Sequence, residues 1–223
     1  MKSRRTKLET FRRYILCVIG VFFSALGIAI VRLADLGVSP ISSVANVMSL
    51  KFSMLSLGNW LIIWNCVMIL GQILILRRRF QPVQLMQVPL SILFGYFTDF
   101  GMWVFAWATW DFYPMRLVNV AVGTCLMGFG IAICVIADAV MNSGEAFVKA
   151  VSDTTHLEFG NVKIGFDVSC VVLSIVLSLG FFAFTIRGTR EGTIIAALCT
   201  GIVIKFFTRL LRHPMERIFG LHP

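Results

Sequence analysis

Charged side chains are scarce in this sequence of 223 residues. Asp, Glu, Lys and Arg make up 14% of the chain, whereas they make up about a quarter of a soluble domain. Hydrophobic residues make up 58%, and the mean hydropathy is +0.87. Several apolar runs approach or exceed the roughly 20 residues that cross a ~30 Å hydrocarbon core. The scarcity of charge therefore excludes a soluble globular domain and predicts a polytopic membrane protein with one membrane domain.

Cysteine pairs and histidine clusters are also missing. All six cysteines lie inside apolar runs and none forms a C-x-x-C pair, so we expect them to serve as small apolar residues of helices. His156 lies in an expected loop, and His213 and His222 lie near the C-terminus. No Ser-His-Asp or paired-His arrangement is placed for catalysis. We therefore expect no metal, no cofactor and no catalytic residue, and the sequence does not indicate an enzyme.

The net charge of +9 raises the question of a nucleic-acid partner. The basic residues lie at the ends of the apolar runs, where membrane topology and anionic lipid headgroups account for them. We therefore expect membrane lipid as a partner and no nucleic acid. An oligomer or a protein partner stays open.

The apolar runs predict an all-α protein with six transmembrane helices and two shorter amphipathic segments. Residues 1–13 form a basic cytoplasmic arm, 14–212 a single membrane domain, and 213–223 a short cytoplasmic tail. The expected spans cover about 14–36, 59–76, 83–107, 115–140, 165–186 and 192–211, and the short segments cover 37–57 and 141–164. Six spans put both termini on one side of the membrane. Most of the 20 Lys and Arg residues fall on that side, which predicts cytoplasmic termini.

One stretch of sequence occurs twice, at residues 26–40 and 129–143. Gly27, Ala29, Ala34 and Asp35 recur at one constant offset as Gly130, Ala132, Ala137 and Asp138. With small shifts in register, Asn65 matches Asp167, and Gly95 and Asp99 match Gly201 and Lys205. Repeat 1 covers about 14–110 and repeat 2 about 115–212, each with three spans and a short broken or re-entrant helix. An odd number of spans inverts the second repeat, and inverted repeats with broken helices are typical of transporters.

Three motifs carry a family resemblance. They are Ala-Leu-Gly-Ile-Ala at 25–29, Ala-Asp-Leu-Gly-Val-Ser-Pro at 34–40 and Leu-Gly-Asn-Trp at 57–60. With these motifs the chain resembles the YczE/YyaS/YitT family of bacterial integral membrane proteins, and it is most similar to the YczE branch. The resemblance implies a multi-span protein of the bacterial cytoplasmic (inner) membrane without a settled biochemical activity. It implies no catalytic residues.

Charges inside the expected spans are the first candidates for a site. Arg32 and Asp35 are spaced i,i+3 and could pair. Either Arg32 binds an anionic group and Asp35 orients it, or the two form a structural ion pair near the outer interface. Asp138 has Val135 in the place of that arginine. It either accepts a proton in coupled transport or is a helix-end carboxylate near Lys149.

The starts of the two short helices are the second candidates. Helix N-termini suit anions, and the residues involved are Ser39 and Ser43 in the first half and Asn142 and Ser143 in the second. Glu145 lies in the first turn of the second helix, where a carboxylate already satisfies the helix dipole. That favours a cation or proton in the second half. The alternative is ordinary capping of two surface helices.

Asp99 and Lys205 fall at equivalent positions of the third and sixth spans. We expect a structural pair across the repeats, and the alternative is a role in substrate binding or gating. The leading hypothesis is a small inverted-repeat transporter or permease of an unknown small solute, with an anion as one candidate. The alternative is a non-transporting membrane partner, or a substrate-binding subunit, that docks other membrane proteins through small residues such as Ala25 and Ala29.

Overall fold

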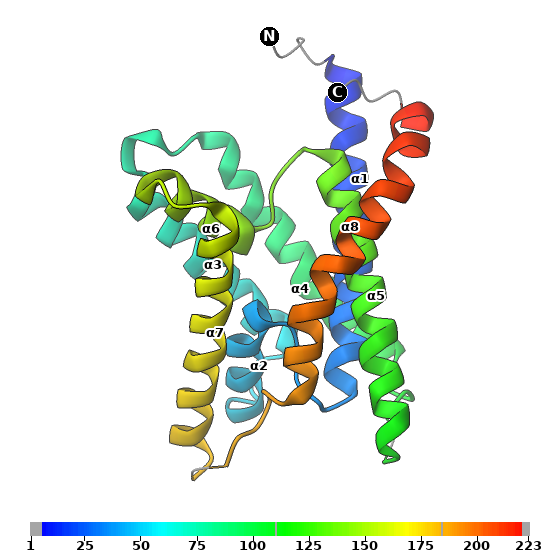
Figure 1. Cartoon of the computed structure of the whole chain (residues 1–223), viewed down its shortest axis with the longest axis vertical. Coiled ribbons are helices and arrows are strands. Elements are labelled where there is room, and N and C mark those ends of the chain that lie inside the picture. Colours follow the sequence, from blue (N-terminus) through cyan, green and yellow to red (C-terminus); the bar gives the residue numbers. More distant parts are fainter. Residues whose placement is uncertain (1–5, 110, 184, 220–223) are drawn as a thin grey trace.

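The computed structural model describes residues 6–109, 111–183 and 185–219, and all the regular structure in these ranges is helical (Figure 1). Residues 1–5 of the expected basic arm lie outside the described residues. The expected all-α class is confirmed. The elements are α1 (Lys7–Leu33), α2 (Pro40–Lys51), α3 (Leu57–Leu76), the 3-10 turns η1 (Arg77–Arg79) and η2 (Pro82–Met86), α4 (Gln87–Val104), α5 (Tyr113–Ala137), α6 (Ser143–Thr155), α7 (Phe159–Phe181) and α8 (Glu191–Phe219).

Five helices are long and apolar enough to cross a membrane, namely α1, α3 with the turn that follows it, α5, α7 and α8. This agrees with a membrane protein. The expected third span, 83–107, appears as α4, which is shorter and is not among the five. Gln87, Ser91 and Asp99 lower the hydropathy of this 18-residue helix. The expected number of six spans is therefore not confirmed by length and composition.

Two helices extend beyond the expected limits of the membrane domain. α1 begins at Lys7 rather than near residue 14, because the Thr6 side chain caps it by accepting a hydrogen bond of 3.2 Å from the Glu9 N–H. One turn later, Arg13 forms an ion pair of 2.8 Å with Glu9. At the other end of the chain, α8 continues to Phe219 through the expected tail.

The centre of the fold is the contact between α1 and α5, which run antiparallel. A Cβ atom added at Gly27 would lie 2.4 Å from the Met127 nitrogen, and one at Gly130 would lie 2.4 Å from the Gly20 oxygen. The two backbones are therefore in direct contact, which small residues permit in lipid. The first and fourth spans thus pack through their small faces. Ala25 and Ala29 are both fully buried, so they cannot serve as an exposed docking face.

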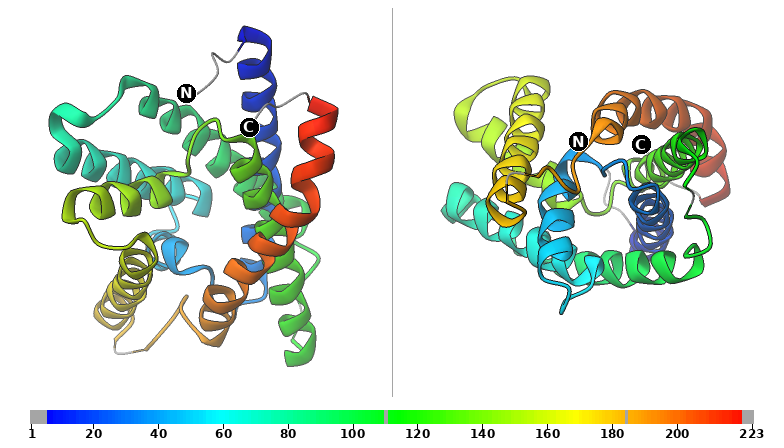
Figure 2. Two further views of the ribbon diagram at one scale, coloured as in Figure 1. Left: turned by 45° about the horizontal axis from the view of Figure 1, so that its top comes forward. Right: turned by 90° about the horizontal axis from the view of Figure 1, so that it is seen from below.

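The other long helices are arranged around this pair. α4 packs on α1 through the Phe22–Phe97 ring contact of 5.1 Å, and α8 packs on α5 through the Phe129–Phe207 contact of 5.3 Å. α3 packs on α4, whereas α7 stands apart from α8 (Figures 1 and 2). Each short helix packs on a long helix of the other half of the chain, α2 on α7 and α6 on α3.

Candidate functional site

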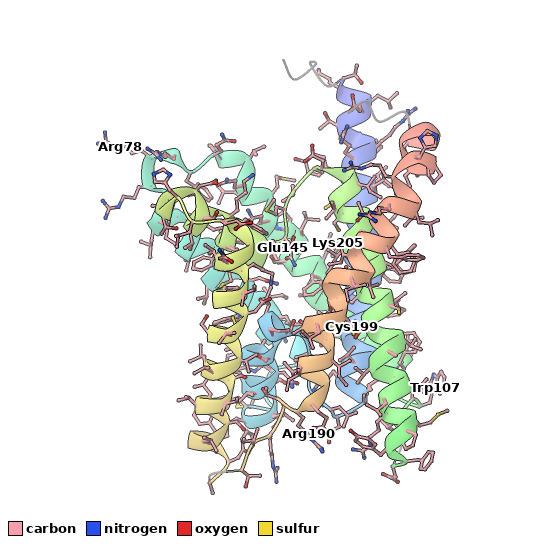
Figure 3. All side chains as sticks on the ribbon, viewed as in Figure 1. Arg78, Trp107, Glu145, Arg190, Cys199 and Lys205 are labelled. Carbon is pink, nitrogen blue, oxygen red and sulfur yellow. The ribbon has the colours of Figure 1, made fainter. Side chains whose placement is uncertain are left out.

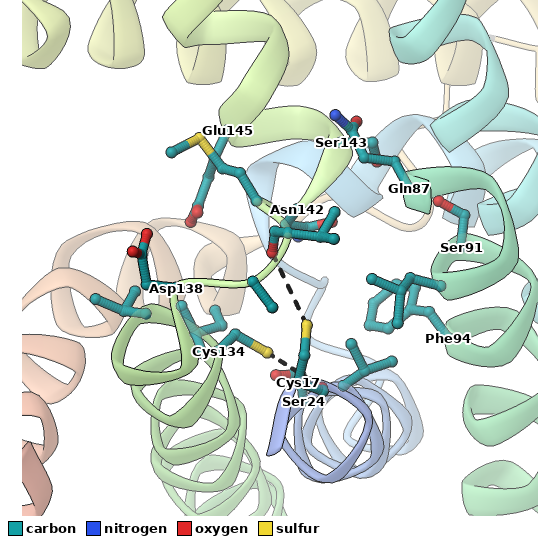
Figure 4. A pocket seen from close by; sticks show the side chains of 17 residues that line it. Cys17, Ser24, Gln87, Ser91, Phe94, Cys134, Asp138, Asn142, Ser143 and Glu145 are labelled. Atoms are coloured by element: carbon teal, nitrogen blue, oxygen red, sulfur yellow. Dashed lines mark hydrogen bonds between the residues drawn. The ribbon is translucent and has the colours of Figure 1, made fainter. Parts of the chain in front are cut away.

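A cavity of about 250 Å³ lies near the end of the bundle where α1 begins (Figure 4). Its walls come from α1, α4, the end of α5, the segment 138–142 and the start of α6. Apolar side chains such as Val21, Leu90 and Phe94 alternate with polar ones. The polar lining residues are Ser24, Gln87, Ser91, Asp138, Asn142, Ser143 and Glu145. The structure thus brings the four candidates of the second half, Asp138, Asn142, Ser143 and Glu145, to one cavity.

The end of α5 positions Asp138 at this cavity. The residue adopts left-handed backbone angles, φ 44° and ψ 39°, and ends the helix. Asp35 also has a positive φ, 54°, just after α1. Asp is one of the few residues besides Gly that visit this conformation at low cost. The repeated Asp therefore has the same backbone role in both halves, and only in the second half does its side chain line the cavity.

Glu145 lies in the first turn of α6, on the same side of the cavity as Asp138 (Figure 4). Burial raises the pKa of its carboxyl group, the nearby Lys163 lowers it, and Asp167 raises it. Lys163 and Asp167 pair with each other on α7 at 2.5 Å. The residues that line the cavity include two carboxylates and no Lys or Arg.

A buried network of amides holds the start of α6 beside α3 and α4. The Ser143 hydroxyl donates to Asn65 Oδ1 at 2.6 Å, and Gln72 Nε2 donates to the Ser143 carbonyl at 3.0 Å. Gln72 and Gln87 exchange two hydrogen bonds of 3.1 Å each. Sequence reasoning missed this pair, although two amides in apolar helices are a signal of polar contacts in the membrane. The network fixes one wall of the cavity.

The candidates of the first half lie elsewhere. Arg32 and Asp35 are at the opposite end of α1, 3.9 Å apart, and the Asp35 side chain is 64% exposed. The Ser39 hydroxyl donates to Ser42 Oγ at 3.0 Å, and the Ser43 hydroxyl donates to the Pro40 carbonyl at 2.6 Å. None of these side chains lines the cavity. The two halves of the predicted site therefore lie in two places, because α1 and α5 run in opposite directions.

Asp99 and Lys205 do not pair with each other. Asp99 caps the start of α3, where it accepts hydrogen bonds from the Gly58 N–H at 2.8 Å and the Ser56 hydroxyl at 2.5 Å. Lys205 lies exposed on α8 (Figure 3), and no salt bridge joins it to a described acidic residue. The expected cross-repeat pair fails because α3 already satisfies Asp99.

Comparison with known proteins adds one relationship. The family of unknown function DUF6198 matches residues 11–209, which include all the residues that line the cavity. The chain belongs to this family. No curated protein and no solved structure matches it. This DUF6198 chain is therefore placed as a membrane protein of unknown function, and its chemistry has to be argued from its own cavity.

The cavity of this DUF6198 protein has polar groups that can bind a small molecule. Its two carboxylates can accept hydrogen bonds and hold positive charge, while Ser24, Ser91 and Asn142 offer neutral hydrogen-bonding groups. Within the described ranges, no group of three or more His, Cys, Asp or Glu side chains could hold a metal ion. The arrangement can bind a small polar or cationic molecule beside an apolar wall.

Proposed function

We propose that this protein is a small transporter of the bacterial cytoplasmic membrane, built as a six-helix inverted repeat with both termini in the cytoplasm. Its cavity binds a small solute that carries positive charge. The order long, short, long, long in both halves and the antiparallel α1–α5 contact support the inverted repeat. The cavity, with Asp138 and Glu145 among its lining residues, is the observation that carries the proposal.

The charge of the cavity decides the class of solute. Ionisable side chains buried in a membrane protein face a partner or a functional cavity. Arg32, which the sequence offered as an anion ligand, lies at the other end of α1, and the start of α6 already carries Glu145. The buried Glu145 carboxyl group at the cavity favours a cation, so we propose a cation in place of the candidate anion of the sequence hypothesis.

Glu145 adds a proton to this scheme. Because burial raises the pKa of its carboxyl group, the side chain takes up a proton more readily than an exposed glutamate does. A proton on Glu145 and a cation in the cavity therefore compete for the same negative charge. The cavity is suited to exchange of a cationic solute for a proton.

The test uses the full chain, purified in detergent and reconstituted in liposomes, with tetramethylammonium as the probe. We expect tetramethylammonium to raise the unfolding temperature and to enter proteoliposomes, and Asp138→Asn or Glu145→Gln to remove both effects. Asp111→Asn is the control, because it is the same change at a fully exposed carboxylate that does not line the cavity. Equal losses in Asp111→Asn and Asp138→Asn, or stabilisation by phosphate or acetate in place of ammonium ions, would reject the proposal.

A further inference from the structure

In the first half of the chain, α3 and α4 are closed against each other. A Cβ atom added at Gly58 would lie 2.1 Å from the Gly95 oxygen, and one at Gly95 would lie 2.6 Å from the Gly58 oxygen. The helices meet backbone to backbone, and the Asp99 carboxylate bridges from α4 to the first turn of α3. This contact lies at the start of α3, one helix length away from the turns η1 and η2 that connect α3 to α4.

The equivalent contact in the second half is open. The register that matches Asn65 with Asp167 places Gly58 opposite Gly160, and Gly95 is opposite Gly201. No heavy atom lies within 4 Å of a Cβ atom built at Gly160 or at Gly201. α7 and α8 remain joined through the segment before α8, where the Ser174 and Thr189 hydroxyls lie 2.8 Å apart. Two helices that could meet through glycines are therefore held apart beyond their connection.

The charges on the open pair match each other. Glu158 is the N-cap residue of α7, in the place that Ser56 has on α3. Lys205 occupies the place of Asp99. Both Glu158 and Lys205 are exposed. If α7 and α8 closed as α3 and α4 do, a Lys–Glu ion pair would replace the Asp–Ser hydrogen bond at the same position.

The counterpart of the cavity is closed. Residues 35–39 follow α1 as 138–142 follow α5, and here Leu36 and Gly37 are buried against the start of α8. The Gly192 N–H donates to the Leu36 carbonyl at 2.8 Å, and Leu36 is fully buried in a cluster with Ala34 and Val120. A Cβ atom added at Gly37 would lie 2.2 Å from the Thr193 hydroxyl. Thr193 is the counterpart of Gln87, a residue of the first half of the chain that lines the open cavity.

Two buried hydroxyls, one in this closed region and one on α5 a turn away from Val120, point to a second state. Thr193 Oγ1 and Thr124 Oγ1 are buried and have no hydrogen-bond partner among the described residues. Thr124 has the place of Val21, another residue of the open cavity. A buried hydroxyl without a hydrogen-bond partner destabilises the conformation that contains it. The cost is explained if these groups line a cavity in another conformation.

We infer that α4 and α8 exchange partners between two conformations, each packing either on the preceding long helix or on the segment that follows α1 or α5. In the structure, α4 packs on α3, and the cavity at 138–142 is open. α8 packs on 35–39 and stands apart from α7. In the second conformation, α8 closes on α7 through Gly160, Gly201 and the Glu158–Lys205 pair, and α4 leaves α3 and covers 138–142. The α1–α5 contact stays fixed. That this exchange serves alternating access rests on the proposed transport function. The exchange itself is argued from the helix contacts and does not depend on that function.

Valine at Gly201 is the sharpest perturbation, because it fills space that is empty in the structure and needed in the second conformation. Gly201→Val should fold normally and hold the protein in the observed conformation. Gly165→Val is the matched control. It is also a glycine with nothing within 4 Å of its Cβ position, but it has Ile63 as its counterpart on α3 and lies outside the proposed contact.

The readout is the reactivity of a cysteine at position 193, introduced as Thr193→Cys, with a maleimide added to the reconstituted full chain. Peptide-resolved mass spectrometry separates this site from the six native cysteines. We expect measurable labelling at 193 in the otherwise wild-type chain. Labelling should be slower by about tenfold or more with Gly201→Val, because overpacking of this size costs a closed contact at least that factor. It should be unchanged with Gly165→Val and faster with Gly58→Val, which disrupts the α3–α4 contact.

A zero-length carbodiimide provides a second measurement on the wild-type chain. It should couple the Lys205 amine to the Glu158 carboxylate, and the product should be absent with Gly201→Val and present with Gly165→Val. Equal labelling and equal coupling in these two variants, or no labelling at 193 even with Gly58→Val, would overturn the exchange of partners. No solute is needed for either measurement. Exchange without tetramethylammonium uptake would instead reject the proposed transport and leave the exchange standing.

Discussion

Replacing Gly27 by alanine tests whether the α1–α5 contact holds the fold together. The added Cβ would lie 2.4 Å from the Met127 nitrogen and 2.6 Å from the Gly123 oxygen, whereas ordinary van der Waals contacts begin at 3.4 Å. Both neighbours are backbone atoms of a helix and cannot rotate away. The two helices therefore have to separate by about 1 Å at this level.

The expected size of the effect follows from two opposing terms. Overpacking of this kind costs about 1–3 kcal/mol, while alanine stabilises a helix over glycine by about 0.8–1 kcal/mol. The net loss should therefore lie between about 0 and 2 kcal/mol. For a chain of this length, 1 kcal/mol corresponds to about 2–4 °C, so the unfolding temperature should fall by at most about 8 °C.

The assay is thermal unfolding of the full chain in detergent, with Gly180→Ala as the control. Gly180 lies on α7 and has no heavy atom within 4 Å of its Cβ position, so only the helix-propensity term applies and the unfolding temperature should stay level or rise. If Gly27→Ala proved as stable as Gly180→Ala, direct backbone contact between α1 and α5 would be refuted.

Three further outcomes follow from the site. Asp99→Ala removes two hydrogen bonds from the start of α3 and should cost about 1–3 kcal/mol in thermal unfolding, with Asp99→Asn losing less. Glu145 lies near Asp138, Lys163 and Asp167, and burial raises the pKa of its carboxyl group. Its protonated form therefore stabilises the folded state at pH values below the ordinary glutamate pKa. This stability is lost as the pH rises through the raised pKa. Unfolding temperature plotted against pH should therefore fall less steeply for Glu145→Gln than for the wild type. Gln72→Leu leaves Gln87 and the Ser143 carbonyl without their partner. It should lower the unfolding temperature more than the double change of Gln72→Leu with Gln87→Leu does.

Hydropathy was sufficient to predict the class of the protein, because long apolar runs have few alternatives to membrane helices. The repeated stretches also contain Gly27 and Gly130, which lie in the α1–α5 contact, as small residues on a membrane helix usually face another helix. The length of α1 was harder to predict. Thr6 and the Glu9–Arg13 pair extend it into the basic arm, and such local hydrogen bonds leave no mark on hydropathy.

The candidate site was predicted only in its second half. Asp35 and Asp138 share a sequence context, so charge alone gave no reason to separate them. Their common feature is the left-handed backbone at a helix end, and their different surroundings depend on where α4 and α8 pack. That packing is tertiary: Gln87 reaches the cavity, whereas its counterpart Thr193 is buried against the segment after α1. No local pattern in the sequence distinguishes these two outcomes.

The antiparallel glycine contact also has a consequence for how the protein is made. α1 ends at Leu33 and its partner α5 ends at Ala137, so about one hundred residues separate the synthesis of the two helices. At about 5–20 residues per second, α1 waits about 5–20 s in the bilayer before α5 is complete. During that time its glycine face, with the backbone carbonyl of Gly20 and the hydroxyl of Ser24, has no helix of this protein to cover it. Until then α1 has its lipid-facing side chains and its contact with α4 to hold it in the bilayer, and the central contact of the finished protein forms late.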